Sequence, residues 1–212
     1  GDSKWITGEQ ARSYAHRLRA QHDAVLVGVG TVLADKPALN CRGMPDEGLQ
    51  IKQPHRVILD STARTPLDGP LWSTAGGPVT VACRATAPRE RLAALRAKGA
   101  DILEIQAGTG LLPLREVLAA LTQRGALSVL VEGGSQVLGS VLDERLADMA
   151  YVFVAPRVIG GRESVPAVGG SGVARIAEAR ELQSVAVHTL GRDVLISGVL
   201  STWEWERPAV TA

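Results

Sequence analysis

Glu132, Gly133 and Gly134 end an apolar run in the stretch "VLVEGGSQVLGSVL", residues 129–142. A carboxylate at such a position needs solvent or a partner, because a buried unpaired charge is costly; a ligand with N–H or hydroxyl groups would supply one. The glycines let backbone amides approach a ligand closely. A helix beginning near Ser135 would add free N–H groups and its dipole, which together bind anions. Spacing alone leaves an ordinary strand-to-helix turn equally open.

Two other predicted strand ends carry residues suited to a ligand. Gly28 and Gly30 precede Thr31, but Leu33 stands where a dinucleotide-binding G-x-G-x-x-G motif has its third glycine. The pair of glycines is therefore weak evidence for a nucleotide site, and a tight turn explains it as well. After the second strand, the segment 60–64 reads "DSTAR". This sequence fits a ligand-binding loop and a plain Asx-type turn without a ligand about equally well.

Composition excludes several classes of function. The 212 residues are 45% hydrophobic and 21% charged, which is typical of one globular domain. A net charge of +1 and 3% aromatic residues give no footprint for nucleic acid or an anionic membrane. Cys41, Cys83 and four dispersed histidines lack metal-ligand spacing, so we expect no metal site. No signal peptide or membrane-spanning stretch is evident, and two thiols without a disulfide framework suit the cytoplasm.

Hydrophobic patterning predicts an α/β domain. Short apolar runs predict strands at 24–29, 55–60, 78–83, 101–106, 127–132 and 149–156. Helical patterns occupy 8–22, 87–99, 112–125 and 134–146. The alternation from 78 to 132 implies right-handed crossovers between parallel strands. Residues 183–200 contain two β-rich runs around "LGRD", which indicates an antiparallel hairpin. We predict one mixed sheet, parallel in its middle and antiparallel at its C-terminal end.

Three separate segments together resemble one known family. They are "GDSKWITGEQAR" with "HRLRAQHDAVLVGVGTVLADKPALNCR" (1–12 and 16–42), "QPHRVILDSTARTP" (53–66), and "VLVEGGSQVLGSVLDERLADMAYVFVAPRVIGG" (129–161). In order and spacing these segments resemble the reductase domain of bacterial riboflavin biosynthesis deaminase/reductase enzymes, the RibD C-terminal domain family. The resemblance runs over nearly the whole chain.

The resemblance implies a fold and an activity. The fold would be a dihydrofolate-reductase-like mixed sheet, mostly parallel with an antiparallel C-terminal strand pair and helices on both faces. The activity would be NADPH-dependent reduction of 5-amino-6-(5-phosphoribosylamino)uracil, with hydride delivered to ribose C1′ to give the ribitylamino product. The protein would position both small molecules and stabilise the open form of the sugar. A homodimer is also implied.

The resemblance further implies a set of ligand contacts but identifies no catalytic residue. The implied substrate contacts are Ser3, Arg19, Leu39, Arg42 and Glu132. The implied cofactor contacts are Trp5, Thr31, Asp35, Ser61 and the run Gly134, Ser135, Gln136, Val137, Leu138, Gly139 and Ser140. A guanidinium suits a phosphate because it offers forked, permanently charged donors. Alternatives remain open: Arg19 as a surface charge, Leu39 as ordinary core and Trp5 as a capping aromatic.

The chain departs from the family pattern at two places. Lys36 stands in "DKP" where the family usually has Asp-Asp-Pro, and "NCR", residues 40–42, replaces Thr-x-Arg. Lys36 brings positive charge that either favours the cofactor's 2′-phosphate or faces solvent.

Two family parts have no counterpart in these 212 residues. One is a strand before position 1, with an "slDGk"-like sequence; the other is the companion zinc deaminase domain. We expect residues 1–206 to form the reductase domain and 207–212 a C-terminal tail, as part of a bifunctional deaminase–reductase or a free-standing version that works with a deaminase. The alternatives are a same-fold NADPH reductase for another pterin-like or nucleoside substrate, and a non-catalytic cofactor-binding module.

Overall fold

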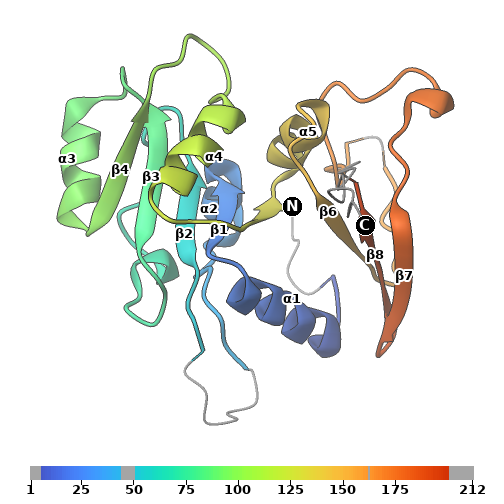
Figure 1. Ribbon diagram of the computed structural model, residues 1–212. Helices are drawn as coiled ribbons and strands as arrows, with labels where there is room; N and C mark the ends of the chain where they lie inside the picture. The colour runs from blue at the N-terminus through green and yellow to red at the C-terminus, as the bar shows by residue number, and fades with distance from the viewer. Residues whose placement is uncertain (1–5, 44–50, 162, 201–212) are drawn as a thin grey trace, which may run out of the picture.

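Five parallel strands form the central layer of the protein, in a computed structural model that describes residues 6–43, 51–161 and 163–200. The strands are β1 (Ala24–Gly28), β2 (His55–Leu59), β3 (Val79–Arg84), β4 (Ala100–Ile105) and β5 (Val129–Gly133). Their order across the sheet is β4-β3-β2-β1-β5, and every neighbouring pair is parallel. The predicted parallel middle of the sheet is confirmed (Figure 1).

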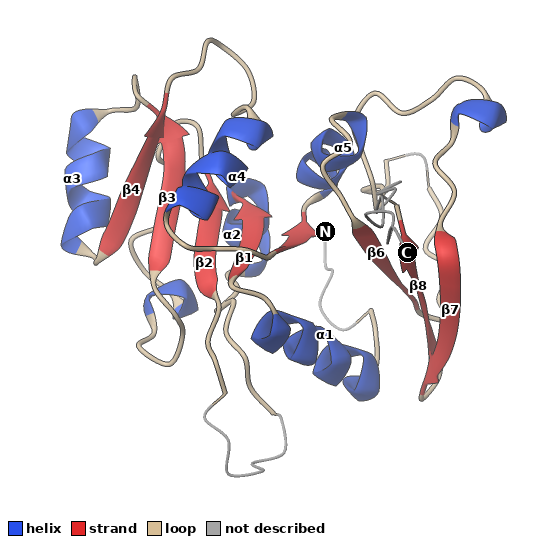
Figure 2. Cartoon of the chain, in the orientation of Figure 1, coloured by secondary structure: helices blue, strands red, loops and turns tan. Residues whose placement is uncertain are grey.

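Helices cover both faces of this sheet, as predicted (Figure 2). Successive side chains of a strand point to opposite faces, so Val25 and Val27 of β1 join one buried cluster while Ala24 and Leu26 join another. The first cluster also holds apolar residues of α2 (Val29–Asp35), α3 (Arg89–Ala97) and the short 3-10 helix η1 (Pro70–Trp72). The second holds those of α4 (Leu114–Gln123), with α5 (Ser135–Asp143) packed against it. Burial on both faces explains why these strands read as continuous apolar runs.

The C-terminal strands are antiparallel, as the "LGRD" hairpin predicted. They are β6 (Met149–Val154), β7 (Gln183–Leu190) and β8 (Asp193–Val199), in the order β6-β8-β7, with the 3-10 helix η2 (Ile176–Glu178) before β7. They pair as a sheet of their own and not as the C-terminal end of the one mixed sheet that the sequence predicted, because β5 and β6 do not pair. Among the described residues, β5 and β6 are therefore edge strands of the two sheets. The family strand expected before position 1, the domain range 1–206 and the tail 207–212 stay predictions, and residues 201–212 lie outside the described part.

Helix α1 (Glu9–Gln21) connects the two sheets. The amide of Gly8, at its N-terminus, donates to Asp193 Oδ2 at 2.6 Å, and Tyr14 meets the ring of Phe153 on β6 edge-on, with centroids 6.1 Å apart. The C-terminal end of the helix runs directly into β1. The side of α1 that faces away from the antiparallel sheet therefore lies toward the edge strand β5. No helix among the described residues is long and apolar enough to cross a membrane.

Candidate active site

The N-terminus of α5 is the clearest ligand-binding feature at the carboxyl ends of the parallel strands. Gly134 is its N-cap in extended conformation and makes no side-chain cap. The first intrahelical bond is donated by Leu138 to the Gly134 carbonyl, so the three preceding amides have no partner within the helix. Gly133 has φ +117, which only glycine adopts without strain. These amides and the helix dipole suit an anion such as a cofactor phosphate.

Helix α2, which follows β1 without a loop, lies directly beside this helix N-terminus. A Cβ atom on Gly134 would lie 3.3 Å from Thr31 Oγ1, and one on Gly28 would lie 2.9 Å from Val137 Cγ2. The structure therefore brings together Thr31 and Gly134, two predicted cofactor contacts that are far apart in sequence. The partly buried Val137 side chain packs against the core between α5 and β1.

The second half of the predicted cofactor run faces another part of the protein. A Cβ on Gly139 would lie 2.4 Å from the backbone of Gly169 and Gly170, and the Gly169 amide donates to Ser135 O at 2.9 Å. Ser140 Oγ donates to the carbonyl of Gln136 one turn earlier. Gly139 thus allows the loop before β7 to pack against α5, a role that the sequence pattern alone did not indicate.

Arg19 and Glu132, both predicted substrate contacts, are paired with each other. Arg19 Nε donates to Glu132 Oε1 at 2.6 Å and Nη2 donates to Oε2 at 2.7 Å. The two side chains are 15% and 21% exposed, so the pair is neither fully buried nor freely solvated. The forked geometry fixes the carboxylate plane at the end of β5. Because Glu132 neutralises Arg19, Arg19 is a weaker candidate for the substrate phosphate than an unpaired arginine would be.

The segment between α2 and residue 43 completes this side of the site. Leu39 has φ +52 and is only 2% exposed, and its side chain packs within the core. The next carbonyl, of Asn40, accepts from Arg19 Nη1 at 2.9 Å and contacts His16 Nδ1 at 3.1 Å. The Asn40 side chain accepts from Arg42 Nη1 at 3.2 Å, and Arg42 is exposed. Arg42 is therefore an exposed cation near the Arg19–Asn40 contact, and its charge suits an anionic group.

The loop after β2 is held rigidly. Asp60 is fully buried, and its Oδ2 accepts from the amide and hydroxyl of Thr65 at 2.6 and 2.7 Å. Arg91 of α3 donates to the carbonyls of Ala63 and Thr65 from the other side. Ser61 is half-buried on this loop, and the Arg64 side chain is 62% exposed with Nε 4.0 Å from Asp60 Oδ1. The loop therefore presents a hydroxyl and a cation from a fixed backbone.

The remaining predicted contacts lie at the margins of this arrangement. Asp35 is the half-buried last residue of α2, and Lys36 caps that helix in the left-handed conformation. Ser3 and Trp5 lie outside the described residues. Among the residues that the structure describes, no cluster of His, Cys, Asp and Glu could hold a metal ion. His16 was missed by sequence reasoning, and the only available signal was its position three residues before Arg19 on one helix face.

A glycine-flanked helix N-terminus beside an ion pair, at the carboxyl ends of parallel strands, defines a ligand-binding α/β domain. Comparison with known proteins identifies its family. The chain matches the RibD C-terminal domain over residues 1–196, and it belongs to that family.

Its relatives are consistent with this assignment. The chain is 36% identical over 200 residues to the riboflavin biosynthesis protein RibD of Actinobacillus pleuropneumoniae, covering 94% of this chain and 52% of the relative. It is 35% identical to the 2,5-diamino-6-ribosylamino-4(3H)-pyrimidinone 5′-phosphate reductase of Methanothermobacter thermautotrophicus, covering 92% and 87%. The structure of Acinetobacter baumannii RibD superposes with a TM-score of 0.78 at 29% identity, covering 94% and 53%. The chain thus spans about half the length of the RibD relatives that it matches.

Proposed function

We propose that the chain reduces 5-amino-6-(5-phosphoribosylamino)uracil with NADPH, giving the ribitylamino product of riboflavin biosynthesis. The observation that carries this proposal is the adjacency of two sites. Glu132, held by Arg19, is separated from the free amides of α5 by Gly133 and Gly134 alone. Hydride transfer requires cofactor and substrate to touch, and two contiguous sites at one strand end suit that requirement.

Each ligand has a distinct set of candidate contacts. Arg42, exposed and bonded to Asn40, is the residue that we assign to the substrate phosphate. Glu132 would accept from N–H or hydroxyl groups of the pyrimidine or sugar. The α5 amides and Thr31 would hold the dinucleotide, and the cofactor supplies the hydride when bound. The Ser61 hydroxyl and the exposed Arg64 guanidinium suit the extra phosphate of NADPH, and this favours NADPH over NADH.

The relatives support this choice of substrate class. The reductase of Methanothermobacter thermautotrophicus, named for a diaminated ribosylaminopyrimidinone phosphate, aligns over 87% of its own length, so the reductase region is nearly all that it contains. About half of the RibD relative's length lies outside the region that matches this chain, and the deaminase domain expected from the resemblance would lie in that part. Whether the pyrimidine is reduced before or after deamination is therefore part of the test.

The test is consumption of NADPH by the purified protein in the presence of the ribosylaminopyrimidine phosphate, followed by absorbance and by mass detection of the ribityl product. We expect turnover with NADPH and much slower turnover with NADH. The aminated and deaminated pyrimidines are tested side by side. Binding of NADPH by a folded protein that reduces neither pyrimidine would contradict the proposal and favour the non-catalytic module. Reduction of a pterin-like or other nucleoside substrate instead would favour the alternative reductase.

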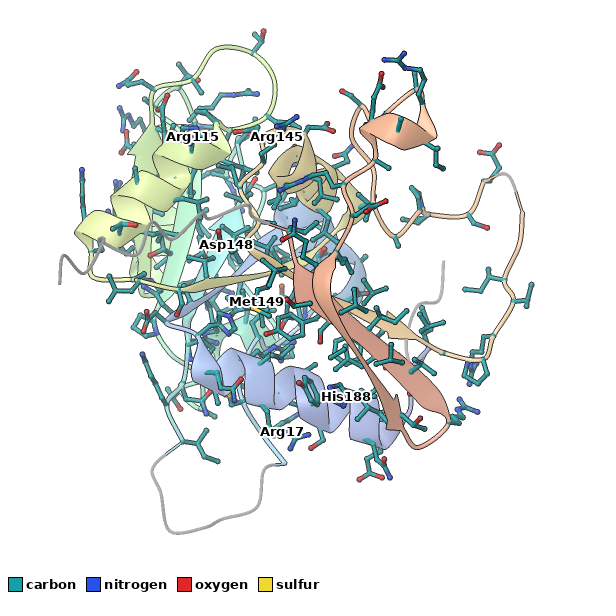
Figure 3. All side chains as sticks on the ribbon, turned by 45° about the vertical axis from the view of Figure 1, so that its right-hand side comes forward. Arg17, Arg115, Arg145, Asp148, Met149 and His188 are labelled. Atoms are coloured by element: carbon teal, nitrogen blue, oxygen red, sulfur yellow. The ribbon has the colours of Figure 1, made fainter. Side chains whose placement is uncertain are left out.

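We also propose a homodimer that forms through one face of the antiparallel sheet. Val152 on β6 and Val187 on β7 both pair with Ile196 on the central β8, so the three side chains form a row across the sheet. Val152 is 45% and Val187 64% exposed, with Val154 beside them at 47%. The opposite face of the sheet packs Phe153 against α1. An exposed apolar row without charge is self-complementary, which a two-fold interface requires; Figure 3 turns this sheet toward the viewer.

Replacing Val187 with glutamate is expected to convert the dimer to a monomer. Two-fold symmetry would place two unpaired carboxylates in the interface, and we expect the dissociation constant to rise at least about a hundredfold. Sedimentation velocity measures the change. Leu127→Glu is the matched control, because Leu127 is 86% exposed in the loop before β5, away from this sheet. A wild-type protein that stays monomeric at high micromolar concentration would contradict the dimer, and dissociation by both variants would contradict the assigned face.

A further inference from the structure

His16 is a half-buried titratable side chain that no contact assigned above uses. It lies one turn before Arg19 on α1, and both residues approach the carbonyl oxygen of Asn40. Arg19 in turn holds Glu132. His16 is therefore joined through one shared acceptor to the ion pair at the substrate side of the site.

The shared carbonyl determines the tautomer of His16. A carbonyl oxygen only accepts hydrogen bonds, so the 3.1 Å contact requires the proton on Nδ1. In the neutral ring, Nε2 then carries a lone pair. No described residue hydrogen-bonds to Nε2. The ring is thus fixed by Nδ1, and Nε2 is left without a hydrogen bond to the described part of the chain.

The surroundings of His16 favour its neutral form. Burial lowers the pKa of His16 from 6.5, and the guanidinium groups of Arg19 and Arg42 lower it further. The Asn40 carbonyl and the Glu132 carboxylate oppose this effect without overcoming it. The facing groups come from α1, from the segment 40–42, which also carries the buried Cys41 thiol, and from β5. At neutral pH Nε2 is therefore an acceptor among guanidinium donors.

We propose that His16 is a substrate-contacting residue whose Nε2 accepts a hydrogen bond from an N–H or O–H group of the substrate lying against the Arg19–Glu132 pair. Its ligand class is a sugar hydroxyl or an exocyclic amine of the pyrimidine, both of which are donors. Arg19 and Arg42 offer only hydrogen-bond donors to the substrate, and Glu132 is the other acceptor in this set of contacts. His16 therefore adds a neutral acceptor to the site. This inference rests on the proposed function.

Two substitutions separate the two nitrogens of His16. In His16→Asn the amide nitrogen can replace Nδ1 as donor to Asn40, but nothing replaces Nε2. In His16→Gln the longer side chain can place an amide oxygen near Nε2. We expect His16→Asn to fold with an unchanged melting temperature and to lose about tenfold or more in kcat/KM. His16→Gln is expected to stay within about threefold of the wild type in kcat/KM. NADPH affinity is expected to be the same in all three proteins.

The pH profile supplies a second readout. Protonation of Nε2 removes the acceptor, so kcat/KM of the wild type should fall as the pH drops below 6.5 toward the lowered pKa of His16. His16→Gln, which does not titrate there, should lack this contribution to the acid limb. A purely structural role predicts the reverse ranking, with Asn active and Gln impaired, and an unchanged acid limb in His16→Gln; either result overturns the inference.

Substrate binding by calorimetry distinguishes failure of this inference from failure of the proposed function. If the wild type binds the ribosylaminopyrimidine phosphate but does not reduce it, the function fails, while weaker binding by His16→Asn than by His16→Gln still supports the contact. Equal binding by the two variants overturns it. A wild-type protein that neither binds nor reduces this substrate overturns both proposals.

Discussion

Glu132→Gln is expected to lower kcat/KM by about two orders of magnitude while leaving NADPH affinity unchanged. The carboxylate is held by two hydrogen bonds from Arg19, at 2.6 and 2.7 Å. A glutamine presents an amide N–H to one of these donors and leaves the Arg19 charge unpaired, so the side chain rotates or the arginine moves. The substrate then loses an ionic acceptor. The cofactor keeps its site because the α5 amides begin beyond Gly133 and Gly134.

A matched control is available elsewhere in the chain. Glu104 lies on the outer strand β4, and its carboxylate accepts hydrogen bonds from two arginines, Arg89 and Arg96. Glu104→Gln makes the same chemical change away from the site, and we expect kcat/KM to stay within about twofold of the wild type. A double-mutant cycle of Arg19→Gln with Glu132→Gln should be strongly non-additive, because the two residues act as a unit. Additive losses, or an equal loss of NADPH affinity in Glu132→Gln, would contradict the assignment of Glu132 to the substrate.

Arg56→Met is expected to cost about 3–5 kcal/mol of unfolding free energy, the largest stability effect that we predict. Arg56 is 4% exposed on β2 and has no acidic partner among the described residues. Its guanidinium donates to the carbonyls of Gly77 at 2.8 Å and Leu71 at 2.5 Å, and more weakly to Ser73 and Ala38 at 3.4 and 3.2 Å. Methionine fills a similar volume but removes the guanidinium donor from these carbonyls, of which that of Ser73 also accepts from the Gly76 amide.

The measurement is denaturant unfolding monitored by circular dichroism. Arg17→Met is the matched control, since Arg17 is exposed on α1 (Figure 3) and its guanidinium lies over the ring of Tyr14 in a cation–π geometry. We expect that change to cost less than about 1 kcal/mol. Equal destabilisation by the two variants would contradict the role given to Arg56. Because Arg56 also holds Ala38, next to Leu39 and Asn40, a folded Arg56→Met protein should bind substrate less tightly.

Local pattern was enough to predict most of the fold. The apolar runs of β1, β2 and β3 are buried on both faces, and such runs are recognisable without knowledge of their neighbours. The helix α2 was not predicted, because seven residues that include Gly30 are too short to show a helical period. The pairing of β6 with β8 and β7 in a separate sheet was not predicted either, because pairing depends on contacts between distant segments.

The candidate site divides in the same way. The sequence by itself determined that a carboxylate, two glycines and a helix start follow one another at 132–135, because neighbours in the chain stay neighbours in space. Only the tertiary structure decided that Arg19 holds Glu132 across 113 positions, that His16 shares the Asn40 carbonyl with Arg19, and that Gly139 lies against Gly169 and Gly170. Those relations depend on how α1, the segment after α2 and the loop before β7 pack on the sheet. Packing is a property of the whole chain, which no single motif records.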